Sequence, residues 1–144
     1  MSFVKIWIHT VFATKQRFPY ITKINKREII NHIKTNAIEK NIFIDHINGG
    51  SEHMHCLISL KGDQSISAVM QLIKGESSFW INKNSLVQGK FQWADDFYAA
   101  SVSESQIEKV RLYIKNQEEH HRKRSWEDEC NEFMGKYGFT KSLG

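Results

Sequence analysis

The sequence predicts an α+β domain of the ferredoxin-like (RRM-like) type, an antiparallel sheet with helices on one face and two further helices at the C-terminal end. Apolar residues make up 40% and aromatic residues 12% of the 144 residues, enough for a sizeable core. Strand-type and helix-type segments follow each other in the order strand, helix, strand, strand, helix, strand. That order is typical of an antiparallel sheet covered by its two crossover helices.

The first half of the chain contains three strand segments and one helix segment. Residues 3–14, "FVKIWIHTVFAT", are rich in β-branched and aromatic side chains and predict a strand. Residues 24–41 carry isoleucines at helical spacing and predict an amphipathic helix. Residues 42–47 and 53–60 predict two further strands, and the glycine pair 49–50 predicts the turn between them.

The second half repeats the alternation and then becomes helical. Residues 65–84 place apolar side chains along one helical face, and residues 97–102, "FYAASV", predict a strand. An apolar stripe recurs at helical spacing over 103–121, and residues 125–138 open with acids and end near a glycine. Both segments are therefore expected to be helices.

Capping residues support three of these helix starts. Asp63 or Ser65 is expected to cap the second helix, and Ser125 the last one. Ser103 with Gln106 three residues later forms a capping-box pattern at the start of the third.

We expect one domain over residues 1–144. The only proline is Pro19, and no low-complexity linker or internal repeat interrupts the chain. The predicted core spans about 3–102, followed by one helix over about 103–121 and another over about 125–138.

Charge and cysteine content restrict the function classes. Twenty Lys and Arg against sixteen Asp and Glu give a net charge of +4, a modest excess that suits a polyanion but does not demand one. No CxxC pattern exists, which excludes a cysteine-rich zinc site, and Cys56 within an apolar run is expected to be a core residue. The N-terminus lacks a secretory signal pattern and no apolar run is long enough for a membrane span, so a cytoplasmic protein is expected.

Two histidines lie in the strand "HMHCLISL". Because side chains alternate along a strand, His53 and His55 share one face and Met54 points to the other. This pair could present two imidazoles to one metal ion, or it could be two chance histidines in a strand. Leu57 and Ser59 continue the same face and supply no third ligand.

A third ligand could come from the helix predicted over 103–121. Tyr113 and Gln117 lie one turn apart on one shoulder of its apolar stripe, and His121 lies one turn further on. If the stripe packs on the sheet, Gln117 could join the histidines beside the phenol of Tyr113. The alternative is a tyrosine at the edge of a core and a glutamine in solvent.

Taken in order, the motifs resemble one family. "EHMHCLISL", "QSISAVMQLIKGESSFWIN" and "YIKNQ" are similar to segments of the single-tyrosine HUH transposases of the insertion-sequence 200/605 type. HUH denotes histidine, hydrophobe, histidine, and the family's Tyr-x-x-x-Gln pattern matches Tyr113 to Gln117. The opening "WIHTVFATKQR" and the segment "LIKGESS" also resemble the family's first strand and second helix. The resemblance spans about residues 4–120, and Glu52 stands where the family usually has an aspartate.

This resemblance implies a DNA transposase that cleaves and rejoins single-stranded DNA at transposon ends. Tyr113 would be the nucleophile and form a 5′-phosphotyrosine link. His53, His55 and Gln117 would hold Mg²⁺ or Mn²⁺, with His121 as a rival or additional ligand. Glu52 could support a metal-bound histidine by a hydrogen bond.

The resemblance also implies partners. They are single-stranded DNA with hairpins at the element ends and a second copy of the chain, in a bacterial or archaeal cytoplasm. The aromatic residues that could stack on bases are Trp80, Phe91 and Trp93, although tryptophans are more often core residues than stacking platforms. The basic residues expected to contact DNA are Lys15, Arg17, Lys74, Arg122, Lys123 and Arg124.

Competing assignments remain at the sequence level. Tyr98, on a strand, is the second choice for the nucleophile, whereas Tyr20 and Tyr137 have no ligand-like neighbours and are interpreted as packing or surface residues. A non-catalytic, domesticated nucleic-acid-binding module on the same fold would make both motifs relics. A metal-dependent hydrolase would use the ion to activate water, although the pattern after His55 fits known hydrolase motifs poorly.

Overall fold

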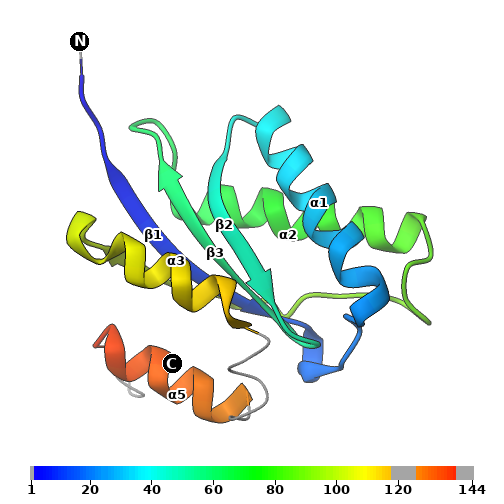
Figure 1. Cartoon of the computed structure of the whole chain (residues 1–144). Helices are drawn as coiled ribbons and strands as arrows, with labels where there is room; N and C mark the ends of the chain where they lie inside the picture. The colour runs from blue at the N-terminus through cyan, green and yellow to red at the C-terminus, as the bar shows by residue number, and fades with distance from the viewer. Residues whose placement is uncertain (1, 118–125, 139–144) are drawn as a thin grey trace.

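The sheet has four antiparallel strands, as the segment order predicts. We describe a computed structural model of the chain, which covers residues 2–117 and 126–138. The strands are β1 (Ile6–Ala13), β2 (Phe43–Gly49), β3 (His53–Leu60) and β4 (Tyr98–Val102), and they lie in the order β2-β3-β1-β4 (Figure 1). β1 and β3 are therefore the two central strands.

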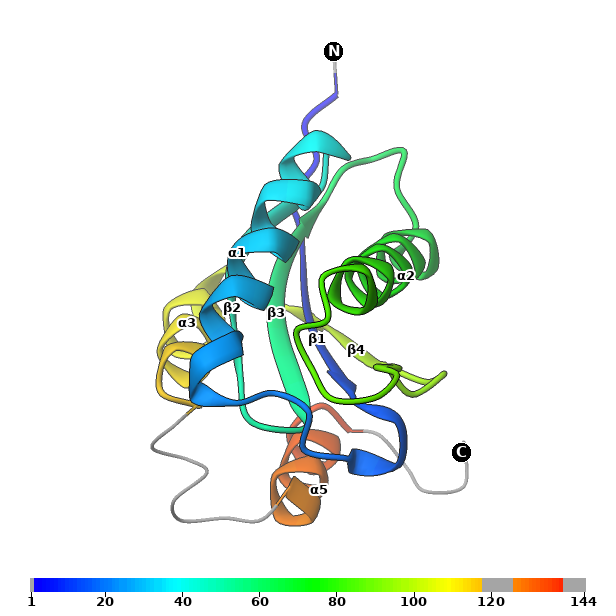
Figure 2. The same cartoon turned by 90° about the vertical axis from the view of Figure 1, so that its right-hand side faces the viewer.

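Two long helices cover one face of the sheet and a shorter one covers the other. α1 (Lys23–Glu39) and α2 (Ile66–Lys83) lie on one side, and α3 (Ile107–Lys115) lies on the opposite side (Figure 2). α5 (Trp126–Lys136) runs beside α3 (Figure 1). The predicted ferredoxin-like sheet, with a third helix and a terminal helix added, is confirmed. In the described part of the chain no helix is both long and apolar enough to cross a bilayer.

Strand β3 divides its side chains between the two faces. Met54, Cys56 and Ile58 join the core under α1 and α2, whereas Leu57 joins a second, smaller core under α3. Burial raises the pKa of the Cys56 thiol to about 12, so it stays a neutral core group, as expected from its apolar run.

The helix starts agree with the capping predictions only in part. Ser65 caps α2, since its hydroxyl accepts from the Ala68 amide at 3.1 Å. The capping box predicted at Ser103 and Gln106 is wrong: the segment opens with a 3-10 turn, η2 (Glu104–Gln106), without a side-chain cap. Glu104 accepts instead from the indole of Trp7 at 2.7 Å, which fixes this turn against β1. The cap predicted at residue 125 lies outside the described residues.

The turn between β2 and β3 brings two backbones very close. A Cβ on Gly49 would lie 2.0 Å from the carbonyl oxygen of His53, so only glycine fits there. Gly49 is the last residue of β2 rather than part of the turn, and the Gly50 amide donates to the same His53 carbonyl at 3.0 Å. This contact fixes the backbone at the start of the histidine strand.

Candidate active site

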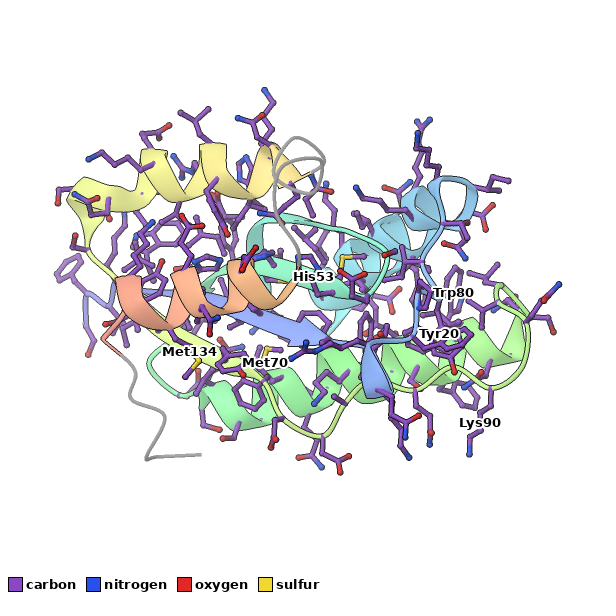
Figure 3. All side chains as sticks on the ribbon, turned by 90° about the horizontal axis from the view of Figure 1, so that it is seen from below. Tyr20, His53, Met70, Trp80, Lys90 and Met134 are labelled. Atoms are coloured by element: carbon purple, nitrogen blue, oxygen red, sulfur yellow. The ribbon has the colours of Figure 1, made fainter. Side chains whose placement is uncertain are left out.

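Both histidines of the HMH motif are buried on the face of the sheet that α3 covers. His53 and His55 are 0% exposed, and Met54 between them lies in the core on the opposite face. In Figure 3 the labelled His53 lies on the side of α3 and Met70 lies on the side of α2. The predicted alternation is confirmed.

Helix α3 is held on this face by its apolar stripe. Ile107, Val110 and Ile114 are buried against Leu57 and Trp7 of the sheet. The shoulder that carries Tyr113 and Gln117 therefore lies next to the histidines, as the helical spacing predicted.

Gln117 meets the histidine pair with its amide oxygen. This fully buried side chain donates from Nε2 to the carbonyl of Tyr113 at 3.1 Å, which fixes the orientation of the amide. Its Oε1 then lies 3.3 Å from Nε2 of His53. The ring of Tyr113 approaches His55 edge-on, with centroids 5.4 Å apart at 79°.

The other ring nitrogen of each histidine has a partner. Nδ1 of His53 lies 3.2 Å from Oε1 of Glu52, whose other oxygen accepts from the hydroxyl of Ser51 at 2.5 Å. Nδ1 of His55 lies 2.9 Å from Nε2 of His9. A carboxylate can only accept, so Glu52 favours the tautomer of His53 that carries its proton on Nδ1.

This donor set fits a divalent ion. With its proton on Nδ1, His53 presents the lone pair of Nε2 towards the oxygen of Gln117, so two acceptor atoms face each other at 3.3 Å. Two ligands that bind one ion at about 2.1 Å each, at an angle of about 90–110°, lie about 3.0–3.4 Å apart. Within the described ranges, no three His, Cys, Asp or Glu side chains gather around a point where an ion could sit, so a site here would need the amide of Gln117.

Sequence reasoning missed His9. This residue is 1% exposed and bridges two groups, with Nε2 at 2.9 Å from His55 and Nδ1 at 2.8 Å from the hydroxyl of Tyr137. Period-two alternation in β1 puts His9 on the same face as Trp7 and Val11, and that signal could have drawn attention to a buried histidine. Tyr137 packs against the smaller core, as expected from the sequence, and its hydroxyl also contacts a histidine, which the sequence did not indicate.

The basic residues predicted to contact DNA do not all lie near the buried histidines. Lys15 and Arg17 are exposed in η1 (Lys15–Arg17), directly after Thr14, whose amide donates to the carbonyl of Glu52 at 2.8 Å. Lys74 lies on α2, on the other side of the sheet, where it donates to the carbonyl of Asp95 at 2.8 Å. Four further predicted residues lie outside the described part of the chain: His121, Arg122, Lys123 and Arg124.

The aromatic residues proposed for base stacking belong largely to the core. Phe91 is 0% and Trp93 7% exposed, so neither ring is available to stack on bases in this fold, and the core alternative holds for Trp93. The indole of Trp93 donates to the hydroxyl of Ser77 at 2.9 Å, which fixes it between α2 and the sheet. Trp80 is half-buried and stacks on His32, with centroids 4.0 Å apart.

Two other tyrosines were candidates for the nucleophile or for packing. Tyr98, the second choice, is half-buried on β4 and packs edge-on against Phe133 of α5 at 5.9 Å. Tyr20 donates to the carbonyl of Lys90 at 2.9 Å, and both labels lie at the end of the molecule away from α5 (Figure 3).

Comparisons with known proteins identify the family of the chain and agree with its fold. Residues 2–117 match the family described as "Transposase IS200 like". The fold resembles that of a presumed transposase from Deinococcus radiodurans R1, with a TM-score of 0.65 and 20% identity over 81% of this chain and 93% of the other. It also resembles a REP-associated tyrosine transposase bound to a REP hairpin, with a TM-score of 0.64 and 16% identity over 84% of this chain and 72% of the other. No curated protein matches the chain. Because the family model covers more than half of the chain, including both histidines, Tyr113 and Gln117, the chain belongs to the IS200-like transposase family of tyrosine HUH nucleases.

Proposed function

We propose that this protein cleaves and rejoins single-stranded DNA at transposon ends through a 5′-phosphotyrosine intermediate. One observation carries the proposal: on α3, Tyr113 lies edge-on to His55 while Gln117, one turn later, meets His53. A phenol, two imidazoles and an amide oxygen are thus brought together from segments about sixty residues apart. A module that only binds nucleic acid would keep this arrangement as a relic, which the assay below distinguishes from an active site.

The reaction would proceed in two displacements at one phosphorus. The Tyr113 oxygen attacks the scissile phosphate, forms the tyrosine–phosphorus bond and breaks the bond to the 3′ oxygen, which leaves as a 3′-hydroxyl after gaining a proton. A 3′-hydroxyl from the joining strand then attacks the same phosphorus, forms the new phosphodiester and releases the phenol. No bond energy is lost to hydrolysis, so rejoining requires no nucleotide cofactor.

The family implies a metal cofactor, and we propose Mg²⁺ or Mn²⁺ held by His53, His55 and Gln117. When bound, such an ion polarises the phosphate and stabilises charge on the leaving oxygen. The chain's own contribution is orientation: Glu52 holds the ring of His53 through Nδ1, and the Tyr113 carbonyl holds the amide of Gln117.

A basic groove supports single-stranded DNA as the substrate. It has a volume of about 530 Å³ and lies between α1 and the end of α3, beside Asn48 of β2. Asn48 pairs with His55 across the sheet and donates to the carbonyl of Lys115, so the groove borders the site. Its cationic side chains, which would neutralise backbone phosphates, are Lys23, Lys26, Arg27 and Lys115.

The form of the DNA and the assembly state are further parts of the proposal. One structural relative is bound to a hairpin, and we propose that this chain also recognises hairpins at the ends of its element. We also propose a homodimer. In the fold described here α3 covers the histidines of its own chain, so each subunit would hold a complete site.

The test is an assay for a covalent protein–DNA adduct. Labelled single-stranded DNA carrying the element's end hairpin is incubated with protein and Mn²⁺ or Mg²⁺ and separated on a denaturing gel. The parent should form an adduct, and Tyr113→Phe should lose it by roughly 10³-fold or more, the scale of removing a nucleophile. Tyr98→Phe is the matched control and should retain the adduct.

Three outcomes would overturn the proposal. If Tyr113→Phe forms the adduct as well as the parent, the nucleophile is wrong. If the parent binds the hairpin but neither cleaves it nor forms an adduct with either metal, the protein is a non-catalytic binding module. Cleavage that turns over without any adduct would favour a metal-dependent hydrolase.

A further inference from the structure

We infer that the C-terminal helix α5 and the turn that follows it are part of the metal site, because they fix the orientation of His55 through His9 and Tyr137, the residue directly after the helix. The inference rests on the proposed function, since it assumes that His55 binds the ion. It adds two positioning residues, His9 and Tyr137, which lie outside the HMH motif and the Tyr-x-x-x-Gln motif. It also gives a role to the C-terminal segment, for which the sequence motifs supply none.

The three side chains form a continuous chain of contacts. The hydroxyl of Tyr137 lies 2.8 Å from Nδ1 of His9, and Nε2 of His9 lies 2.9 Å from Nδ1 of His55. His9 and His55 are at most 1% exposed, so water does not compete for these positions. Burial raises the pKa of Tyr137 to about 12, which keeps its hydroxyl protonated.

The contacts leave one proton arrangement when His55 binds an ion through Nε2. A neutral imidazole that uses Nε2 as a ligand carries its proton on Nδ1, so His55 donates to Nε2 of His9. His9 then carries its own proton on Nδ1 and donates it to the oxygen of Tyr137. The order of donors therefore runs from His55 through His9 to α5, and it fixes both the tautomer and the ring plane of His55.

Packing from α5 holds His9 in this orientation. The ring of Phe133 meets His9 edge-on with centroids 5.0 Å apart at 82°, and the ring of Tyr137 does so at 5.6 Å and 77°. Phe133 is 4% exposed, so α5 is seated firmly on the sheet at this point. The ammonium of Lys136 lies 5.7 Å from the centre of the Tyr113 ring, so α5 also touches the proposed nucleophile.

A purely structural role for His9 would give a different result from a positioning role. If His9 only fills space, any side chain of similar volume that folds should leave metal affinity unchanged. If His9 positions His55, the affinity should depend on an acceptor at the place of Nε2. Glutamine can supply such an acceptor and leucine cannot.

The test measures Mn²⁺ affinity on the full chain without DNA, by the electron paramagnetic resonance signal of free Mn²⁺. His9→Leu should weaken binding by about 10–100-fold, the scale seen when a group that orients a metal ligand is removed. His9→Gln should recover most of this loss, and Tyr137→Phe should weaken binding by roughly several-fold, because the last acceptor of the chain is removed. Thr10→Val, the next residue on β1 with its side chain on the opposite face, is the matched control and should not change the affinity.

The melting temperature without metal separates folding from positioning. Equal Mn²⁺ affinity in folded His9→Leu and the parent would overturn the inference and leave the proposed function intact. If His9→Leu does not fold, Tyr137→Phe decides, because it removes only one oxygen atom, and parent-like affinity there would overturn the inference. If the parent itself binds no Mn²⁺ although it forms the DNA adduct, the metal assignment and this inference both fail while the nucleophile stands.

Discussion

The two faces of the sheet use burial in opposite ways. Under α1 and α2 the largest buried side chains are apolar and nearly or fully inaccessible; they include Phe12, Ile29, Met54, Ile58 and Met70. Under α3 and α5 the side chains buried to the same degree include imidazoles and an amide; these are His9, His53, His55 and Gln117. Alternate residues of one strand, β3, contribute to both sets: Met54 and Ile58 to the apolar set, and His53 and His55 to the polar set.

This difference separates the residues that stabilise the fold from the residues that could take part in chemistry. Burying an apolar side chain stabilises the native state, whereas burying a polar one costs free energy unless it is hydrogen-bonded. His9 is hydrogen-bonded to His55 and Tyr137, His53 to Glu52, and the amide of Gln117 to the carbonyl of Tyr113, which offsets the cost. A typical hydrogen bond adds only about 1 kcal/mol net, so a buried polar side chain on this face is expected to stabilise the fold less than a large buried apolar side chain on the other.

The largest expected effects come from neighbouring residues of β3 that point to opposite faces. Met54→Ala should lower the free energy of unfolding by about 2–5 kcal/mol, because it empties part of a close-packed core. In chains that remain folded, Mn²⁺ affinity should stay near that of the parent. His55→Leu should lower Mn²⁺ affinity by about 100-fold or more, because one of the three proposed ligands is lost, with a smaller effect on unfolding.

For Met54→Ala and His55→Leu, the free energy of unfolding is measured by denaturant unfolding without metal, and the Mn²⁺ affinity is measured by titration. If each variant loses both properties to the same extent, the two faces are not separable and the comparison fails.

Local sequence patterns predicted the apolar face and half of the site. Period-two alternation was sufficient to put His53 and His55 on one face, and helical spacing was sufficient to pair Tyr113 with Gln117. The limits of β3 agree with the prediction because an unbroken apolar run bounded by turns has few alternatives.

The other half of the site depends on contacts between distant segments. His9 and Tyr137 are 128 residues apart, and no local period relates them. The failed capping box at Ser103 has the same origin, because a contact between Glu104 and Trp7, 97 residues apart, sets the shape of that turn. Tertiary contacts of this kind override local preference.

The next expected effect lies in the groove where the two faces meet, between α1 and α3. Replacing Lys23 and Arg27 with glutamine should weaken single-stranded DNA binding and lower the slope of log affinity against log salt by about 1.4, at about 0.7 per lost phosphate contact. The matched control replaces two exposed cations further from the groove, Lys34 on the same helix and Lys40 at its C-cap. Fluorescence anisotropy across a salt series measures both, and equal slopes for the two double variants would contradict a DNA path through the groove.

The smallest effect concerns how α3 is attached to the sheet edge. Arg111 donates to both carboxylate oxygens of Asp45 on β2, at 2.8 and 3.0 Å, in addition to the narrow apolar stripe. Burial alone would raise the pKa of Asp45, but the hydrogen bonds and charges of Arg111 and His46 outweigh it and lower this pKa below the ordinary 3.8. The stabilisation from this ion pair is therefore fully present above pH 3.8, and it is lost as the pH falls through the lowered pKa of Asp45.

Arg111→Gln should raise the pKa of Asp45, as measured by carboxyl NMR titration. At neutral pH it should also speed amide exchange in α3 a few-fold while leaving α2 unchanged, because α2 rests on the wide apolar core and α3 does not. Lys109→Gln removes a charge from an exposed position on the same helix and should do neither. If amide exchange in α2 and α3 responds alike to Arg111→Gln, the two faces unfold as one unit. The faces would then differ in the residues that they bury but not in their local stability.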